Sequence, residues 1–577
     1  MSRFASSLAC VLWLGGLLSV VGCDDPPAEP ADGGVDASES DGGDPHMGFR
    51  LPACEESDPP PATPLPHVAS TLESTLVPQV DRFAAAGPRN PATEMGEQLY
   101  REMDLHLTDV GPGQPHTHRA DLGADSTATA GRRSIGWFAH LSDFQLVDDE
   151  SPTRLASFDG SLGETSSAMR AQEASIPHAV SAMNRTFARV QRTERPLAFG
   201  VITGDCADSA QRNEIDWVIG VMNGTPGLHV DSGEDDDPVP GPDNDPKDPF
   251  DPTAFPAPWL FVPGNHDVEV TGITAPTAEL RAQALGTTPT GGTRDYRRWY
   301  APVTRTQVPA DPERAIVSRD EIVAQLRATE ATGPHGPPGH GYPATGTVDT
   351  SLGANYAYDA IPGLLRILAL DTSDREGGSE GMVLQETVDG WLVPELERAE
   401  TDGVLVMLAS HHSTTSIDVD SGQFGGPVAG ALEPAAIEAL VASYANVIAW
   451  LVGHSHDNRI RAIEGADAEH PGYWEIMTAA IADYPGQTRT IELVDNGDGT
   501  LSIYGTLIDF DTDSCLEQRY RALLQMEWSS GWSGAVSRRP EDGNVELVRS
   551  IPTGTSAAIT AATAGDRIES LTTLTGT

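Results

Sequence analysis

The sequence predicts an α/β protein in which strands and helices alternate around a largely buried sheet. Short apolar, β-branched runs at residues 135–141 and 197–203 have the length and composition of buried strands. The segment between them carries apolar residues at helical spacing, namely Ile176, Val180, Met183, Phe187 and Val190. Strands separated by amphipathic helices are typical of βαβ units.

The alternation continues along the chain. Further strands are expected at residues 260–262, 356–360, 364–370, 404–409 and 447–452. Further helices are expected at residues 214–222, 388–399 and 434–444. Residues 495–499, Asp-Asn-Gly-Asp-Gly, lie between two short apolar runs and predict a hairpin.

The N-terminus has the pattern of a targeting segment. Arg3 precedes an apolar stretch at residues 8–21, which is short for a membrane span. The stretch ends Val-Val-Gly-Cys, which resembles the lipobox of bacterial lipoproteins. That resemblance implies a signal peptide of residues 1–22, attachment of diacylglycerol to Cys23, and a place in the bacterial cell envelope facing the periplasm or the exterior. The alternatives are an ordinary signal peptide with an incidental cysteine, or a poor membrane anchor.

The remaining chain divides by composition. Residues 23–66 are rich in Asp, Glu, Pro, Gly and Ser and predict a disordered acidic linker. An N-terminal extension (67–133) then precedes the main domain (134–510), which carries insertions at 231–258 and 268–350. Residues 511–577 form a C-terminal extension, with a disordered tail expected from Thr553.

The chain is strongly acidic. It has 36 Lys+Arg against 85 Asp+Glu, a formal net charge of −49. Nucleic-acid affinity depends on Lys and Arg that neutralise phosphates, so no nucleic acid is expected as a partner.

Five short polar blocks each follow an expected strand. In chain order they are Ser-Asp-Phe-Gln (142–145), Gly-Asp-Cys-Ala-Asp (204–208), Gly-Asn-His-Asp (264–267), Ser-His-His (410–412) and Gly-His-Ser-His (453–456). The ends of parallel strands meet at one edge of a sheet, and Asp, Asn and His are ligands of divalent metals. The ordered set therefore predicts a metal centre.

These blocks resemble those of the calcineurin-like metallophosphoesterases, whose pattern is DxH, GDxxD, GNH[DE], a His block and GHxH. The resemblance covers residues 134–507 and implies a four-layer α/β/β/α sandwich. It also implies a binuclear enzyme that hydrolyses phosphate mono- or diesters through a metal-bridging hydroxide, with a small phosphate ester as substrate.

The resemblance also implies the ligands. One metal would take Asp143, Asp205 and His456, and the other would take Asp205 as the bridge, Asn265, His411 and His454. His266 would act as general acid or transition-state stabiliser, and Asp208 would orient it. His412 either faces the substrate or packs.

Gln145 departs from the family pattern, which has histidine there. As a ligand it would give the first metal three oxygen donors and one imidazole, which favours Mn or Fe over Zn. Alternatively, Gln145 holds a water or a substrate oxygen. Ser209-Ala210 stands where Ser/Thr protein phosphatases have Arg-Gly, which argues against that activity.

Two other functions stay open. The Gln145 variant is compatible with a degraded site on a non-catalytic binding lipoprotein. A lipid anchor is compatible with hydrolysis of a phospholipid head group or a nucleotide anhydride.

Overall fold

The computed structural model describes residues 70–80, 96, 99–100, 102–127, 131–156, 171–190, 196–297, 301–329, 339–422, 425–531 and 536–563. The expected signal peptide, Cys23 and the acidic linker lie outside these residues. No helix in this described part of the chain is both long and apolar enough to span a bilayer.

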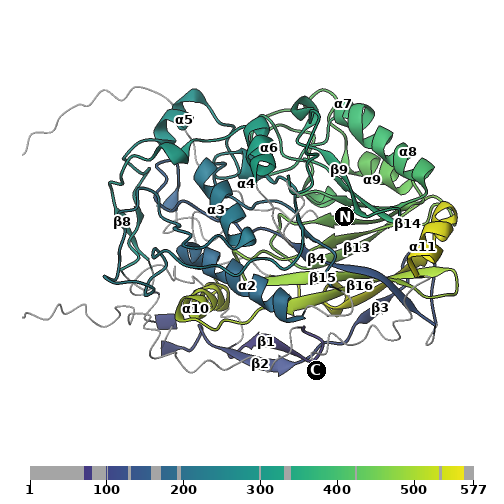
Figure 1. Ribbon diagram of the computed structural model, residues 1–577, viewed down its shortest axis with the longest axis horizontal. Helices are drawn as coiled ribbons and strands as arrows, with labels where there is room; N and C mark the ends of the chain where they lie inside the picture. The colour runs from purple at the N-terminus through teal and green to yellow at the C-terminus, as the bar shows by residue number, and fades with distance from the viewer. Residues whose placement is uncertain are drawn as a thin grey trace, which may run out of the picture. The chain divides into compact units, whose positions relative to one another are not determined.

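A six-stranded sheet forms one half of the core (Figure 1). Its order is β13-β14-β12-β11-β10-β9, with β10, β11, β12 and β14 parallel. The strands are β9 (Tyr356–Ile361), β10 (Leu365–Ala369), β11 (Leu405–Ala409), β12 (Val447–Val452), β13 (Arg459–Glu464) and β14 (Gly472–Met477).

A seven-stranded sheet forms the other half, in the order β3-β17-β16-β15-β4-β5-β6. Strands β4, β5 and β6 are parallel, and β15 and β16 form the predicted antiparallel hairpin. The strands are β3 (Thr117–Arg119), β4 (Arg133–Leu141), β5 (Gly200–Ile202), β6 (Trp259–Phe261), β15 (Gln487–Asp495), β16 (Thr500–Asp509) and β17 (Val545–Ser550).

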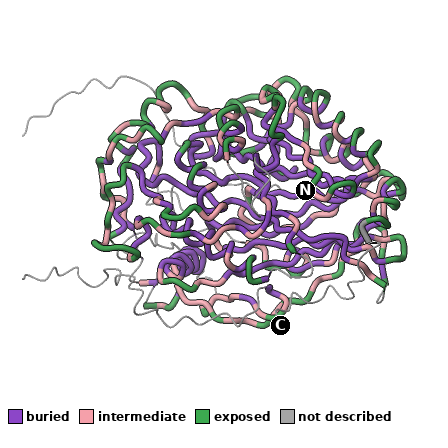
Figure 2. Tube along the Cα trace, viewed as in Figure 1, coloured by how far each residue is buried: buried purple, intermediate pink, exposed green. Residues whose placement is uncertain are grey.

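Alternate side chains of the six-stranded sheet enter different cores. In β11, Leu405 and Met407 belong to a core shared with the seven-stranded sheet, whereas Val406 and Leu408 pack beneath helices. A Cβ on Gly136 of β4 would lie 2.7 Å from Ile361 of β9, so the two sheets face each other closely. The central strands β10, β11 and β12 are therefore buried along their whole length, and Figure 2 shows buried segments through the middle of the molecule.

Helices cover the two outer faces. α8 (Val393–Asp402) and α9 (Pro434–Ala442) pack on the six-stranded sheet, and α2 (Ile176–Val190) and α3 (Arg212–Asn223) pack on the core of the seven-stranded sheet. The expected four-layer α/β/β/α sandwich is confirmed. The remaining helices are α4 (Asn265–Val268), α5 (Ala278–Ala284), α6 (Arg319–Ala328), α7 (Gln385–Thr387), α10 (Cys515–Ser529) and α11 (Ser556–Thr563).

The second insertion contains α5, α6 and the small hairpin of β7 (Thr293–Arg294) and β8 (Val303–Arg305). A second hairpin, β1 (Ser74–Pro78) with β2 (Thr108–Pro112), precedes the sandwich. The C-terminal extension is more ordered than the sequence indicated. Residues 553–563 were expected to be disordered but form a turn and helix α11, because Ile559 is buried in the main core.

Candidate metal centre

The five polar blocks meet at the carboxyl ends of parallel strands. Asp143 follows β4, Asp205 follows β5, and Asn265 begins α4 after β6. From the facing sheet, His411 follows β11, and His454 and His456 follow β12. Both sheets thus contribute to one site.

The backbone turns sharply at these positions. Five of the candidate ligands lie in the left-handed region, which non-glycine residues rarely adopt. They are Asp143 (φ 52°), Gln145 (φ 47°), Asp205 (φ 52°), His454 (φ 74°) and His456 (φ 53°). Such conformations cost free energy and concentrate at functional sites, where the surrounding structure holds them.

His411 is the centre of one ligand group. Its Nε2 lies 2.9 Å from Oδ2 of Asp205 and 3.2 Å from Nδ1 of His454. Its Nδ1 lies 2.7 Å from the carbonyl oxygen of Thr203. The carbonyl can only accept, so Nδ1 carries the proton and Nε2 is the atom available to a metal.

Asp143 and His456 form a second group. Nε2 of His456 lies 3.3 Å from Oδ1 of Asp143, and the same oxygen lies 3.9 Å from Nε2 of His411. Asp143 therefore stands between the two imidazoles. Oδ2 of Asp143 accepts from the backbone nitrogen of His454 at 3.2 Å, which links the first and last blocks.

Within the candidate ligand set, the two buried amide oxygens lack hydrogen-bond partners among the described residues. Both Gln145 and Asn265 are 2 % exposed, and Oε1 of Gln145 and Oδ1 of Asn265 are unpaired. The amide nitrogen of Asn265 donates to the carbonyl of Gly272 at 2.7 Å, so the oxygen is the atom left free. A buried unpaired acceptor is costly unless a cation occupies the space beside it.

The carboxylates at this site favour positive charge. Burial opposes a proton on His411, but Asp205 and Asp143 more than offset it and raise its pKa to about 9. Burial also opposes a proton on His456, whose pKa Asp483 and Asp143 nevertheless raise to about 10. Burial and the charge of His411 lower the pKa of His454 to about 3. The carboxylates therefore favour a cation at this place.

These residues fit divalent ions. Ligands bound at about 2.1 Å in tetrahedral or octahedral geometry lie about 3.0–3.4 Å apart. The three ligand-to-ligand distances above, 2.9, 3.2 and 3.3 Å, are close to that spacing. The donor set of carboxylates, imidazoles and amide oxygens suits Mn, Fe or Zn.

His266 lies beside the ligands, with its backbone nitrogen donating to Oδ1 of Asp205 at 2.9 Å. The structure changes the expected role of Asp208. Nδ1 of His266 lies 2.7 Å from the backbone carbonyl of Asp208 but 3.7 Å from its carboxylate. The carboxylate instead pairs with Nη1 of Arg154 at 2.9 Å. Asp208 thus orients His266 through its main chain.

His412 packs against two candidate ligands, with its ring centroid 4.9 Å from that of His411 and 4.4 Å from that of His454. Its Nδ1 contacts the hydroxyl of Thr372 at 2.9 Å, and its Nε2 lies 3.1 Å from the carbonyl of Ser379. Both nitrogens therefore have hydrogen-bond partners, although His411, His412 and His454 each offer a nitrogen within 4.8 Å of the other two. Cys206, within the second block, is fully buried in the core.

Three residues of the site were not found from the sequence. The carboxylate of Asp267 accepts from the backbone nitrogens of Cys206, Ala207 and Gly264 at 2.8–2.9 Å, which ties two ligand loops together. Gly272 packs against the ring of His266, and Asp483 bonds to Nδ1 of His456. Asp267 is the last residue of the third block, so the sequence singled out its position but not its role. Gly272 and Asp483 lie in loops that carry no sequence motif.

No protein-family description and no curated protein matches this chain. Among solved structures, a dimetal phosphatase from Danio rerio matches with 12 % identity and a TM-score of 0.33, over 66 % of this chain and 99 % of its own. A purple acid phosphatase from yellow lupin (Lupinus luteus) seeds matches with 10 % identity and a TM-score of 0.27, over 69 % of this chain and 55 % of its own. These likenesses are distant.

Proposed function

We propose that this chain is a metal-dependent phosphoesterase that hydrolyses phosphate mono- or diesters outside the cytoplasm. The observation that carries the proposal is the convergence of Asp143, Asp205, His411, His454 and His456 from the ends of strands in two facing sheets. Two divalent ions bound there would lower the pKa of a water and polarise the phosphoryl oxygens.

The residues divide between two ion positions. Asp143, Gln145 and His456 would hold the first ion, and Asn265, His411 and His454 the second, with Asp205 shared. Of the side chains in this set, only a carboxylate offers two oxygens that can each contact a different ion. Asp205 is therefore suited to be the shared ligand. The unpaired oxygen of Gln145 supports direct ligation and a preference of the first position for Mn or Fe.

His266 would protonate the leaving oxygen. Its Nδ1 lies 2.7 Å from a carbonyl that can only accept, so Nδ1 keeps its proton throughout. A protonated ring can then release only the proton on Nε2, and afterwards it remains a neutral imidazole in the same orientation. This is the behaviour required of a general acid.

The test compares hydrolysis of p-nitrophenyl phosphate and bis-p-nitrophenyl phosphate by the full chain with Mn²⁺. His266→Ala should lower kcat by about 10²–10⁴-fold, the usual contribution of general acid catalysis. Asp205→Asn should abolish stoichiometric metal binding and activity together. His470→Ala, which alters a partly exposed histidine paired with Asp467, is the control. Equal turnover by all four proteins would refute the proposal.

The same preparation separates the alternatives. A wild-type chain that holds fewer than one metal per molecule, even with added Mn²⁺, would favour the non-catalytic binding lipoprotein. Phospholipid and nucleotide substrates, assayed beside the nitrophenyl esters, distinguish the third function. The lipid anchor at Cys23 predicts that Cys23→Ser releases the protein from the membrane fraction.

A further inference from the structure

His456 is oriented by a residue of a distant loop. Nδ1 of His456 hydrogen-bonds to the carboxylate of Asp483, while Nε2 of the same ring lies 3.3 Å from Oδ1 of Asp143. The ring therefore has one nitrogen fixed by Asp483 and the other facing the metal centre. A carboxylate on the far nitrogen sets the tautomer of a ligating histidine and increases its basicity.

The loop that carries Asp483 is anchored on both sides. Towards the centre, the backbone nitrogens of Ile481 and Ala482 both donate to the carbonyl oxygen of Asp143 at 3.1 Å. The loop preceding Asp483 is thus bonded directly to the backbone of another candidate ligand.

Away from the centre, helix α10 of the C-terminal extension holds the loop. The hydroxyl of Tyr520 donates to the carbonyl of Ile481, and the ring of Trp528 stacks on Tyr484 with centroids 4.4 Å apart. Gln172 donates both to the carbonyl of Ala482 at 3.1 Å and to Glu527 of α10 at 2.9 Å. Tyr520 and Glu527 lie seven residues apart, about two helical turns, and therefore project from the same side of the helix.

We propose that Asp483 is a positioning residue for the metal ligand His456, and that helix α10 fixes Asp483 for this purpose. This inference rests on the proposed function, because it concerns a ligand of the same centre. The proposed role of helix α10 makes the C-terminal extension part of the site, although the last of the five polar blocks ends at residue 456.

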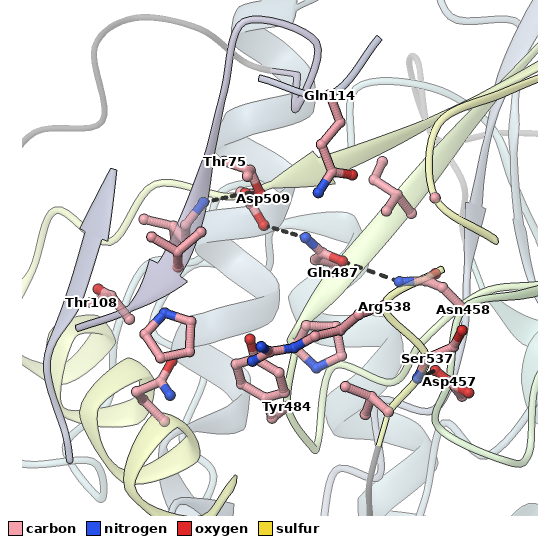
Figure 3. Close-up of a pocket in the computed structure, with 18 of the residues that line it drawn as sticks. Thr75, Thr108, Gln114, Asp457, Asn458, Tyr484, Gln487, Asp509, Ser537 and Arg538 are labelled. Carbon is pink, nitrogen blue, oxygen red and sulfur yellow. Dashed lines mark hydrogen bonds between the residues drawn. The ribbon is translucent and has the colours of Figure 1, made fainter. Parts of the chain in front are cut away.

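A matched control lies close by. Asp457 follows His456 in the sequence, and Tyr484 follows Asp483. Both line a cavity of about 450 Å³, and Asp509 lines the same cavity (Figure 3). Asp509 is a buried carboxylate that accepts from Thr75 and Gln487 at 2.7 Å. Asp509 is therefore, like Asp483, a carboxylate that accepts hydrogen bonds, but its donors Thr75, Leu76 and Gln487 are not candidate ligands.

The experiment measures binding of two Mn²⁺ ions to the metal-free full chain by calorimetry, with thermal unfolding in chelator to verify folding. Asp483→Ala should weaken one of the two binding steps by about 10–100-fold and leave the other step unchanged. Asp483→Asn should have a smaller effect, since its amide oxygen still accepts from Nδ1. Asp509→Asn should bind both ions as the wild type does, whatever its loss of stability.

The outcomes separate the two proposals. If the wild type binds two ions and both Asp483 variants bind them with unchanged affinity, the positioning role is wrong and the phosphoesterase proposal stands. If Asp509→Asn weakens binding as much as Asp483→Ala, the effect is one of general stability and the inference also fails. If Asp483→Ala does not fold, Asp483→Asn decides. A wild type without metal overturns both proposals.

Discussion

Oδ1 of Asp267 lies 2.8 Å from the backbone nitrogen of Ala207, and this contact joins the loop after β6 to the loop after β5. The same carboxylate also accepts from Cys206 and Gly264, so one side chain fixes the backbone beside both Asp205 and Asn265. The site is held by its supporting contacts before any ion binds.

Asp267→Asn should therefore destabilise the metal-free protein. The asparagine amide keeps one acceptor oxygen, but its NH₂ group would face a buried backbone N–H that now donates to the second carboxylate oxygen. Leaving that N–H without an acceptor should lower the free energy of unfolding by about 1–3 kcal/mol. Urea unfolding in chelator measures the loss. Asp311→Asn, which removes a carboxylate from a more exposed loop bond to Gly233, should lose less. Equal losses would contradict a special role for Asp267.

Gly272→Ala should lower activity more than stability alone explains. A Cβ at this position would lie 2.2 Å from Cδ2 and 2.3 Å from Nε2 of His266, and 2.7 Å from Nδ2 of Asn265, so the ring of His266 must move. Gly227→Ala is a close control, because Gly227 has φ +65° against +66° for Gly272 but has nothing within 4 Å of its added Cβ. Both variants bear the strain of a left-handed alanine.

The kcat of the two glycine variants, each measured with its unfolding midpoint, separates strain from displacement of His266. Only Gly272→Ala should lose kcat. A matching loss in Gly227→Ala would show that the ring of His266 is not the cause.

Gln145→His should change the metal preference. The oxygen of Gln145 is buried and unpaired, and an imidazole in its place replaces a hard donor with a softer one. Competition between Mn²⁺ and Zn²⁺ should then shift towards Zn²⁺, relative to the wild type. Gln145→Ala, which supplies no donor, should weaken binding of both ions. An unchanged ratio in Gln145→His would place residue 145 outside the ligand set.

His178 should make stability depend on pH. It is buried against Phe250, and burial lowers its pKa from 6.5 to about 4. The unfolded chain therefore binds the proton more readily, so the stability is fully present above pH 6.5 and is lost as the pH falls towards 4. The loss should reach about 2 kcal/mol at pH 5.

Other buried groups titrate in the same range, so the quantity to measure is the difference between wild type and His178→Asn across pH 5–8. The wild type should lose more stability on acidification than the variant. Parallel curves would mean that His178 titrates alike in the folded and unfolded chains.

The sequence was most informative where chemistry and strand position coincide. The alternation of β-branched runs and amphipathic helices predicted the layers, because burial on both faces of β11 and β12 requires continuous apolar strands. The ligand blocks were found because each follows a strand. The role of Asp483 was not found, because it depends on a loop that crosses from β14 to β15 and on a helix far along the chain. The carboxylate of Asp208 was assigned to His266, but Arg154, which has no motif, binds it instead.

The division of the ligands between two facing sheets has a consequence for biogenesis. Asp143, Asp205 and Asn265 come from one sheet, and His411, His454 and His456 come from the other. Neither half alone has a complete set, and the last ligands follow the first by more than half of the chain. Under the proposed function, binding of both ions would therefore wait until both halves have been synthesised and have docked. Bound ions would then mark a chain whose two halves have folded together. A chain arrested before the halves dock would not bind the ions.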